Sequence, residues 1–116
     1  MRIIETVQDA PIRLLPYEPI EIGDIVEFYH SKCVISSGIK PFGIVSETGG
    51  PYGLVSVWYD TMVFRTNKFE VSKYKSGDPI YCSINGKITN IPPFTDAYML
   101  GHVITFNEKE IEVNWI

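Results

Sequence analysis

The fold class of this chain is decided by one stretch, Ile111-Glu112-Val113-Asn114-Trp115. In it the apolar side chains of Ile111, Val113 and Trp115 alternate with two polar ones. Successive side chains of a β-strand point to opposite faces of the sheet. The stretch therefore predicts a strand with one apolar and one polar face, as a sheet packed on one side requires.

Similar short pieces occur along the whole chain. The 9 glycines and 8 prolines recur at short intervals and separate pieces rich in Ile, Val, Tyr, Phe, Thr and Trp, which favour strands. Candidate strands cover residues 2–7, 11–15, 24–30, 33–36, 42–47, 52–59, 61–65, 78–84, 86–89, 98–106 and 110–116. The best candidate for a helix is a single turn over residues 93–98, because no longer window shows a helical apolar face. The sequence predicts an all-β fold.

One pattern occurs twice. Residues 21–26, Glu-Ile-Gly-Asp-Ile-Val, resemble residues 75–80, Lys-Ser-Gly-Asp-Pro-Ile, and each is followed by a strand that carries a glycine, Gly43 or Gly101. The glycine of Gly-Asp favours a tight turn with positive φ, and a strand glycine marks a bend or a close approach. Such bends let small β-barrels turn corners. Between the later pair, Asn85-Gly86 predicts a hairpin.

The N-terminal segment differs from the rest. Pro11, Pro16 and Pro19 disfavour a central strand over residues 8–22. We therefore expect residues 1–20 to form an extended arm or an edge strand, and residues 21–116 to form a β-barrel domain.

Composition excludes several classes of protein. The 116 residues carry a formal net charge of −4, and the ten basic residues are scattered, which disfavours a nucleic-acid-binding surface. No apolar run reaches the length of a membrane span or signal peptide, so we expect neither a membrane nor a secreted location. Cys33 and Cys82 do not form a disulfide framework, and we expect buried free thiols.

Candidate chemical sites are weak. His30, Cys33, Cys82 and His102 could form a zinc site, but only the first two have the short spacing that such sites use. Cys82 shares a strand face with apolar neighbours, which is typical of a core thiol. The acidic residues lie at turns and at solvent-facing positions, and neither a Gly-x-Ser-x-Gly elbow nor a phosphate loop is present. We expect no catalytic residues, no metal and no cofactor, so the chain is not expected to be an enzyme.

Aromatic residues give the clearest indication of a binding surface. Trp58, Tyr59 and Phe64 lie in a short region that is rich in aromatic residues, and residues 54–59 place large apolar groups on both faces of a strand. One face of such a strand can meet a partner subunit, and Tyr and Trp dominate interface hot spots. Core packing and an interface both remain open for these residues.

The order of these features resembles a known family. The segments "IGDIVEFY", "KPFGIVSE", "GLVSVWYD", "YKSGDPIYCSINGKITN" and "YMLGHVI" are similar to small capsid decoration (head-stabilising) proteins and related virion structural proteins of tailed bacteriophages. The resemblance implies a β-barrel or β-tulip-like fold, often trimeric, on the outside of an icosahedral shell. The chain would be made in the host cytoplasm and would reside in the virion, bound to the major capsid protein or to other virion proteins.

In that family an N-terminal arm typically adds a strand to the capsid sheet. The resemblance implies that Ile3, Ile4, Ile12 and Leu14 bind a partner in this way, with Trp58, Tyr59 and Phe64 on the barrel. On this hypothesis, removing residues 2–15 leaves the barrel folded. Two alternatives remain: a tail or head–tail connector protein, and a small ligand-binding barrel, which requires a pocket lined by convergent polar groups.

Overall fold

A computed structural model describes all residues from 1 to 116 and shows an all-β protein, as predicted. Its eleven strands correspond to the eleven predicted ones: β1 (Arg2–Thr6), β2 (Ile12–Leu14), β3 (Ile25–Tyr29), β4 (Lys32–Ile35), β5 (Gly43–Glu47), β6 (Val55–Trp58), β7 (Met62–Thr66), β8 (Pro79–Cys82), β9 (Ile88–Thr89), β10 (Gly101–Phe106) and β11 (Ile111–Trp115). Residues 93–98, the best candidate for a helix, form no helix but contain a turn in which the N–H of Ala97 donates to the carbonyl of Phe94 (3.3 Å). A short 3-10 turn, η1 (Pro51–Gly53), lies instead in the glycine-rich loop before β6.

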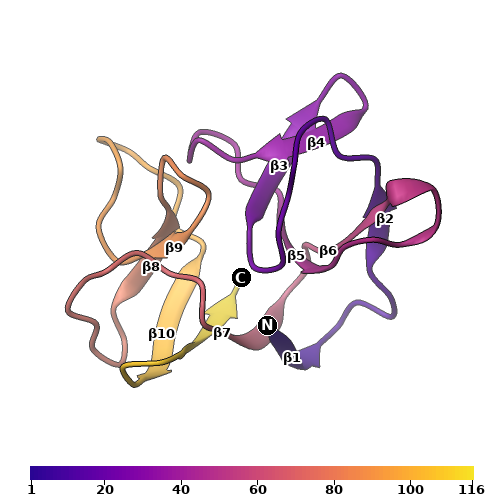
Figure 1. Cartoon of the computed structure of the whole chain (residues 1–116). Helices are drawn as coiled ribbons and strands as arrows, with labels where there is room; N and C mark the ends of the chain where they lie inside the picture. Colours follow the sequence, from indigo (N-terminus) through magenta and orange to yellow (C-terminus); the bar gives the residue numbers. More distant parts are fainter.

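The strands form two antiparallel sheets (Figure 1). One has six strands in the order β1-β7-β11-β10-β8-β9, and the other has five in the order β2-β6-β5-β3-β4. The sheets do not form a closed barrel, which corrects the prediction of a single β-barrel or β-tulip-like domain. Alternation along a strand shows which of its faces is buried, but it does not show whether the outer strands of a sheet meet.

The extended N-terminal arm is also not observed. β1 pairs with β7 at the edge of the larger sheet, and β2 pairs with β6 at the edge of the smaller one. Ile3 packs against one core cluster, and Ile12 and Leu14 pack against the other. Removing residues 2–15 would therefore expose both cores, so we now expect it to unfold the protein.

The two sheets repeat one design. If β1 is set aside, the order β7-β11-β10-β8-β9 matches β2-β6-β5-β3-β4 strand by strand. We call residues 12–59 the first unit and residues 62–115 the second unit, and they lie side by side in Figure 1. Even the β-bulge is repeated: the register shifts between Val45 and Glu47 in the first unit and between Val103 and Thr105 in the second.

The predicted equivalence of the two Gly-Asp signatures is confirmed. Gly23 and Gly77 have φ values of 91° and 90°. In each turn the aspartate accepts a backbone N–H from three residues earlier, at 2.8 Å for both Asp24 and Asp78. The glycine N–H then bonds the neighbouring strand, from Gly23 to the carbonyl of Val45 (2.8 Å) and from Gly77 to that of Val103 (2.7 Å).

Each unit also has its own core, built from equivalent positions. The core of the first unit contains Val26, Cys33, Val45, Val55 and Val57. Superposing the strand registers places these on Ile80, Ile88, Val103, Ile111 and Val113, all in the core of the second unit. In each unit, the segment that follows the strand at one end of the sheet order, β2 or β7, is hydrogen-bonded to the strand at the other end, β4 or β9. The N–H of Tyr17 donates to Cys33 O (2.9 Å), and that of Glu70 donates to Ile88 O (2.8 Å). Each sheet is therefore curled over its core.

The two units differ in how their outer faces are used. Ile25 and Ile44, paired on neighbouring strands of the first unit, point away from its own core and belong to the core cluster of the second unit. The backbone N–H of Ile25 donates to the carbonyl of Gly86 in the second unit (2.8 Å). The first unit thus covers the open side of the second.

Candidate functional site

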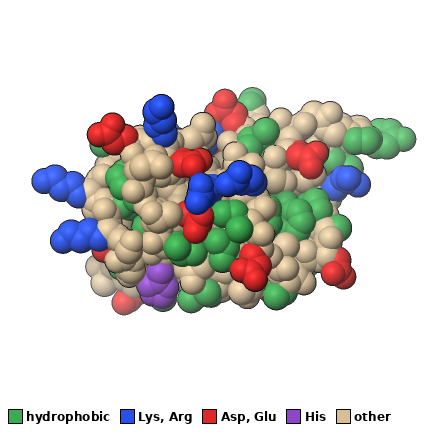
Figure 2. Space-filling model, turned by 90° about the horizontal axis from the view of Figure 1, so that it is seen from below, with side chains coloured by type: hydrophobic (Ala, Val, Ile, Leu, Met, Phe, Trp, Pro, Cys, Tyr) green, Lys and Arg blue, Asp and Glu red, His purple; other side chains and the backbone are tan.

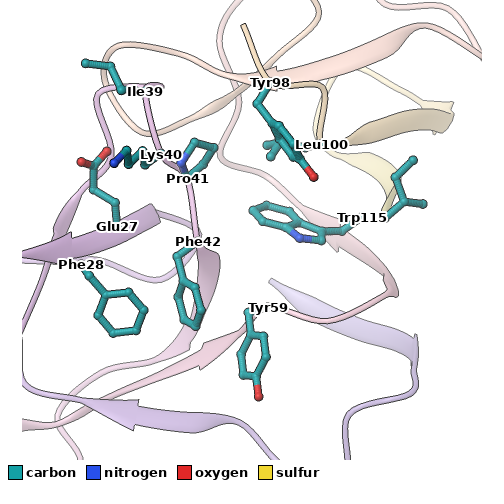
Figure 3. A pocket seen from close by; sticks show the side chains of 11 residues that line it. Glu27, Phe28, Ile39, Lys40, Pro41, Phe42, Tyr59, Tyr98, Leu100 and Trp115 are labelled. Atoms are coloured by element: carbon teal, nitrogen blue, oxygen red, sulfur yellow. The ribbon is translucent and has the colours of Figure 1, made fainter.

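A groove of about 470 Å³ lies where the two units meet (Figure 3). We call it the aromatic groove. Its lining residues are mostly apolar: Glu27, Phe28, Ile39, Lys40, Pro41, Phe42, Tyr59, Tyr98, Leu100, Trp115 and Ile116. Figure 3 shows Phe28, Phe42 and Tyr59 from the first unit on one side and Tyr98, Leu100 and Trp115 from the second unit on the other.

Three aromatic rings form the wall of the first unit: Phe28 on β3, Phe42 just before β5 and Tyr59 just after β6. The ring of Phe42 lies 4.4 Å from that of Phe28 and 4.9 Å from that of Tyr59, and Phe42 and Tyr59 are stacked with an interplanar angle of 21°. Phe42 is held just before β5 by its backbone N–H, which donates to Val26 O (2.8 Å). Phe28 remains 52% exposed and Tyr59 42% exposed. The stacked rings thus present apolar surface to solvent.

The groove offers little acid–base chemistry. Glu27 and Lys40 are its charged lining residues. One carboxylate oxygen of Glu27 accepts hydrogen bonds from the hydroxyl of Ser36 (2.8 Å) and the backbone N–H of Ser37 (3.2 Å), so it is occupied by the first unit itself. The arrangement is suited to binding apolar groups by contact.

The residues predicted to bind a partner from the barrel lie in different places. Tyr59 lies in the groove. Trp58 is partly buried against the core of the second unit, and its indole N–H donates to the hydroxyl of Ser46 at 2.9 Å. Phe64 is fully buried in that core. Only Tyr59 of these three is both exposed and part of the groove.

The residues predicted from the N-terminal arm are divided as well. Ile3, Ile12 and Leu14 are partly buried against the two cores, whereas Ile4 is 47% exposed on β1. None of the four lines the groove.

Sequence reasoning missed Phe28 and Phe42 as site residues. A signal was present, because residues 25–29 of β3 place apolar side chains on both faces of one strand. This is the same signal that directed attention to residues 54–59. It could not show that Phe28 and Phe42 meet, since that contact depends on the pairing of β3 with β5.

The four candidate zinc ligands are not assembled into a site. Cys33 lies in the core of the first unit and Cys82 in that of the second. His30 lies in the tight turn between β3 and β4 with a φ of 47°, and His102 lies on β10. No three His, Cys, Asp or Glu side chains in the chain are grouped so as to hold a metal ion.

Both thiols are expected to be unreactive in the folded protein. Burial raises the pKa of Cys82 to about 11 and also raises the pKa of Cys33. Because the thiolate is the nucleophile, two pKa units reduce its population about 100-fold at pH 8. Labelling with a chromogenic disulfide reagent should modify neither thiol in native protein and both in denaturant. Rapid labelling of one native thiol would contradict the buried positions.

The surface has no region of a single charge sign on the face shown in Figure 2. Lys and Arg side chains are interspersed with Asp and Glu, and hydrophobic patches lie between them. The chain contains no helix with the length and apolar character needed to cross a membrane. Comparison of the sequence with models of protein families and with curated proteins found no match.

Proposed function

We propose that this chain is a virion structural protein of a tailed bacteriophage, which binds the outside of the capsid and stabilises the shell. The observation that carries the proposal is the aromatic groove. Tyr59 stacks on the half-buried Phe42, Phe28 lies tilted against Phe42, and the exposed Phe28 and Tyr59 make this wall apolar. Aromatic residues are enriched at the centres of protein interfaces.

One further feature supports a role in assembly. The doubled Gly-Asp signature, which underlies the resemblance to capsid decoration proteins, has one geometry in both units.

The stabilising effect would be thermodynamic. A protein that binds the assembled shell and not its dissociated subunits stabilises the shell by its binding free energy. Many identical copies multiply a modest contribution from each, and linked copies gain further through avidity.

The test is co-sedimentation with empty shells of the phage that encodes the protein. We expect the protein to sediment with the shells to a saturating ratio and to raise the temperature at which they fall apart. Tyr59→Glu, which places a charge in the groove, should weaken the affinity for the shells at least about tenfold, because burying an unpaired charge costs more than about 1.4 kcal/mol. Wild-type protein that stays in the supernatant at every concentration would overturn the proposal.

A second candidate function follows from the size of the groove. Its volume of about 470 Å³ falls within the range of small-molecule sites, and most of its lining is apolar. In this case the fluorescent probe anilinonaphthalene sulfonate should bind one saturable site that Tyr59→Glu removes. Shell binding that survives Tyr59→Glu, together with loss of the probe site, would favour this candidate.

A further inference from the structure

The two units of the chain pack on each other in a head-to-tail manner. The first unit contributes an outer face, in which Ile25 and Ile44 are paired on neighbouring strands. The second unit contributes the open side of its core, where these two residues join Cys82, Leu100 and Trp115 in one cluster. Different surfaces of the repeated design therefore meet, so this contact is heterologous.

The repeated register identifies the counterpart of each surface. The pair Ile25 and Ile44 corresponds to the pair Pro79 and His102 on the outer face of the second unit. We call Pro79 and His102, with Asn114 opposite His102, the outer face of the second unit.

The open side of the second unit, Cys82, Leu100 and Trp115, also has counterparts in the first unit, and these are the aromatic residues of the groove wall. Cys82 pairs with Ile88 as Phe28 pairs with Cys33. The N–H of Leu100 bonds Ile80 O as that of Phe42 bonds Val26 O, both at 2.8 Å. Trp115 follows Val113 by two residues, and Tyr59 follows the equivalent Val57 by two residues, so Trp115 and Tyr59 are equivalent. Phe28, Phe42 and Tyr59 are therefore the open side of the first unit.

Exposure shows that the internal contact is made and that its two counterparts are free. Ile25 and Ile44 are 0% exposed, and Cys82, Leu100 and Trp115 are at most 4% exposed. Their counterparts are more accessible to solvent: Phe28 and Tyr59 are more than 40% exposed, and Phe42, Pro79, His102 and Asn114 are half-buried. Each chain thus has a second copy of both contact surfaces that is not used within the chain: the outer face of the second unit and the aromatic wall of the first unit.

We propose that the aromatic groove is filled by a second copy of this chain, whose outer face of Pro79, His102 and Asn114 docks on Phe28, Phe42 and Tyr59. The docking repeats between chains the packing that joins the two units within one chain. The proline ring and the imidazole offer flat apolar surface to stacked aromatic rings. The proposal names the partner of the groove on which the proposed function rests.

A head-to-tail contact has a consequence for assembly. Each copy donates one surface and accepts another, so contacts continue until a ring closes, or else an open filament forms. A ring of three copies would be the trimer that the resemblance to capsid decoration proteins implies.

The contact can be tested by complementation between two variants. Phe28→Glu blocks the groove, and His102→Glu blocks the outer face of the second unit. Each variant alone should be a monomer in light scattering under conditions where the wild type is an oligomer. An equimolar mixture retains one intact groove and one intact outer face, so it should form a heterodimer and nothing larger. Val71→Glu, at an exposed site outside both surfaces, should keep the wild-type mass.

Several outcomes would overturn the proposal. These are a monomeric wild type at millimolar concentration, wild-type mass for either single variant, or no heterodimer in the mixture when circular dichroism shows both variants folded. If Phe28→Glu fails to fold, Tyr59→Ser replaces it, because Tyr59 is exposed and its loss leaves no buried charge. The two proposals fail separately: heterodimers without shell binding would refute the capsid role alone, and shell binding by a monomer would refute the groove contact alone.

Discussion

Gly101→Ala should destabilise the protein by about 3 kcal/mol or more, among the largest effects of any single methyl group in this fold. Gly101 begins β10 and pairs with Trp115 on β11. A Cβ at this position would overlap the carbonyl group of Asn114, which is backbone of the adjacent strand and cannot rotate away. The two central strands of the six-stranded sheet would have to separate locally.

Chemical denaturation followed by circular dichroism measures this effect. The equivalent glycine of the first unit, Gly43, offers an internal repeat, since its Cβ would lie 2.5 Å from Trp58 O and 2.6 Å from a methyl carbon of Val57. Gly49→Ala serves as the control, because nothing lies within 4 Å of a Cβ there and only its φ of 72° opposes alanine. Its cost should be about 1 kcal/mol. Equal midpoints for Gly101→Ala and the wild type would show that the strands are not this close.

Asp24→Ala should cost about 3 kcal/mol, whereas Asp78→Ala at the equivalent position should cost about 1 kcal/mol. Both aspartates accept the same turn hydrogen bond at 2.8 Å. Only Asp24 also forms an ion pair, in which its carboxylate lies 2.6 Å from the ammonium of Lys68, with the Asp24 side chain 3% exposed. Burial lowers the pKa of Lys68, but hydrogen bonds to Asp24 and Glu21 outweigh this and raise it.

The turn hydrogen bond is common to both variants, so the difference between them compares the ion pair of Asp24 with the hydrogen bond that Asp78 accepts from the side-chain amide of Asn90 (3.2 Å). Removing Asp24 leaves the charge of Lys68, whose side chain is 19% exposed, with Glu21 alone. Free energies of unfolding at pH 7 provide the comparison. Lys68→Met in the Asp24→Ala background should recover part of the loss, since it removes the unpaired charge. Equal costs for Asp24→Ala and Asp78→Ala would show that the ion pair does not stabilise the fold.

The strands were largely predictable from sequence, but their grouping into sheets was not. Alternation over residues 111–115 and the β-forming residues between glycines and prolines report burial of one face of the local chain. They do not report which strands pair. For this reason β1 and β2 were equally compatible with an arm, although they are edge strands of different sheets.

The duplication was visible only where the chemistry of the two units coincides. The Gly-Asp turns and the strand glycines are constrained by backbone geometry, so both units keep the same residues there. Core positions need only apolar volume, so Cys33 stands where Ile88 stands, and Phe42 where Leu100 stands. The rest of the repeat was therefore hidden in the sequence.

The candidate site was predictable in part for a similar reason. The aromatic excess around Tyr59 indicated a surface, and Tyr59 does line the groove. The same excess could not separate Tyr59 from Phe64, which is fully buried. Neighbouring aromatic residues in a strand look alike in sequence, and only the packing of the two units decides which of them meets solvent.

The position of β11 in the larger sheet has a consequence for biosynthesis. β11 lies between β7 and β10, and it is formed by residues 111–115, so the middle of this sheet is the last strand to leave the ribosome. β1 is synthesised before every other strand of this sheet, and it can pair only when β7 has been made; β7 in turn has β11 as its other neighbour. The strands of the first unit all lie within residues 12–58 and can pair while synthesis continues. We therefore expect folding in two stages, with the six-stranded sheet assembling after the first unit, at the slow rate typical of non-local strand pairing.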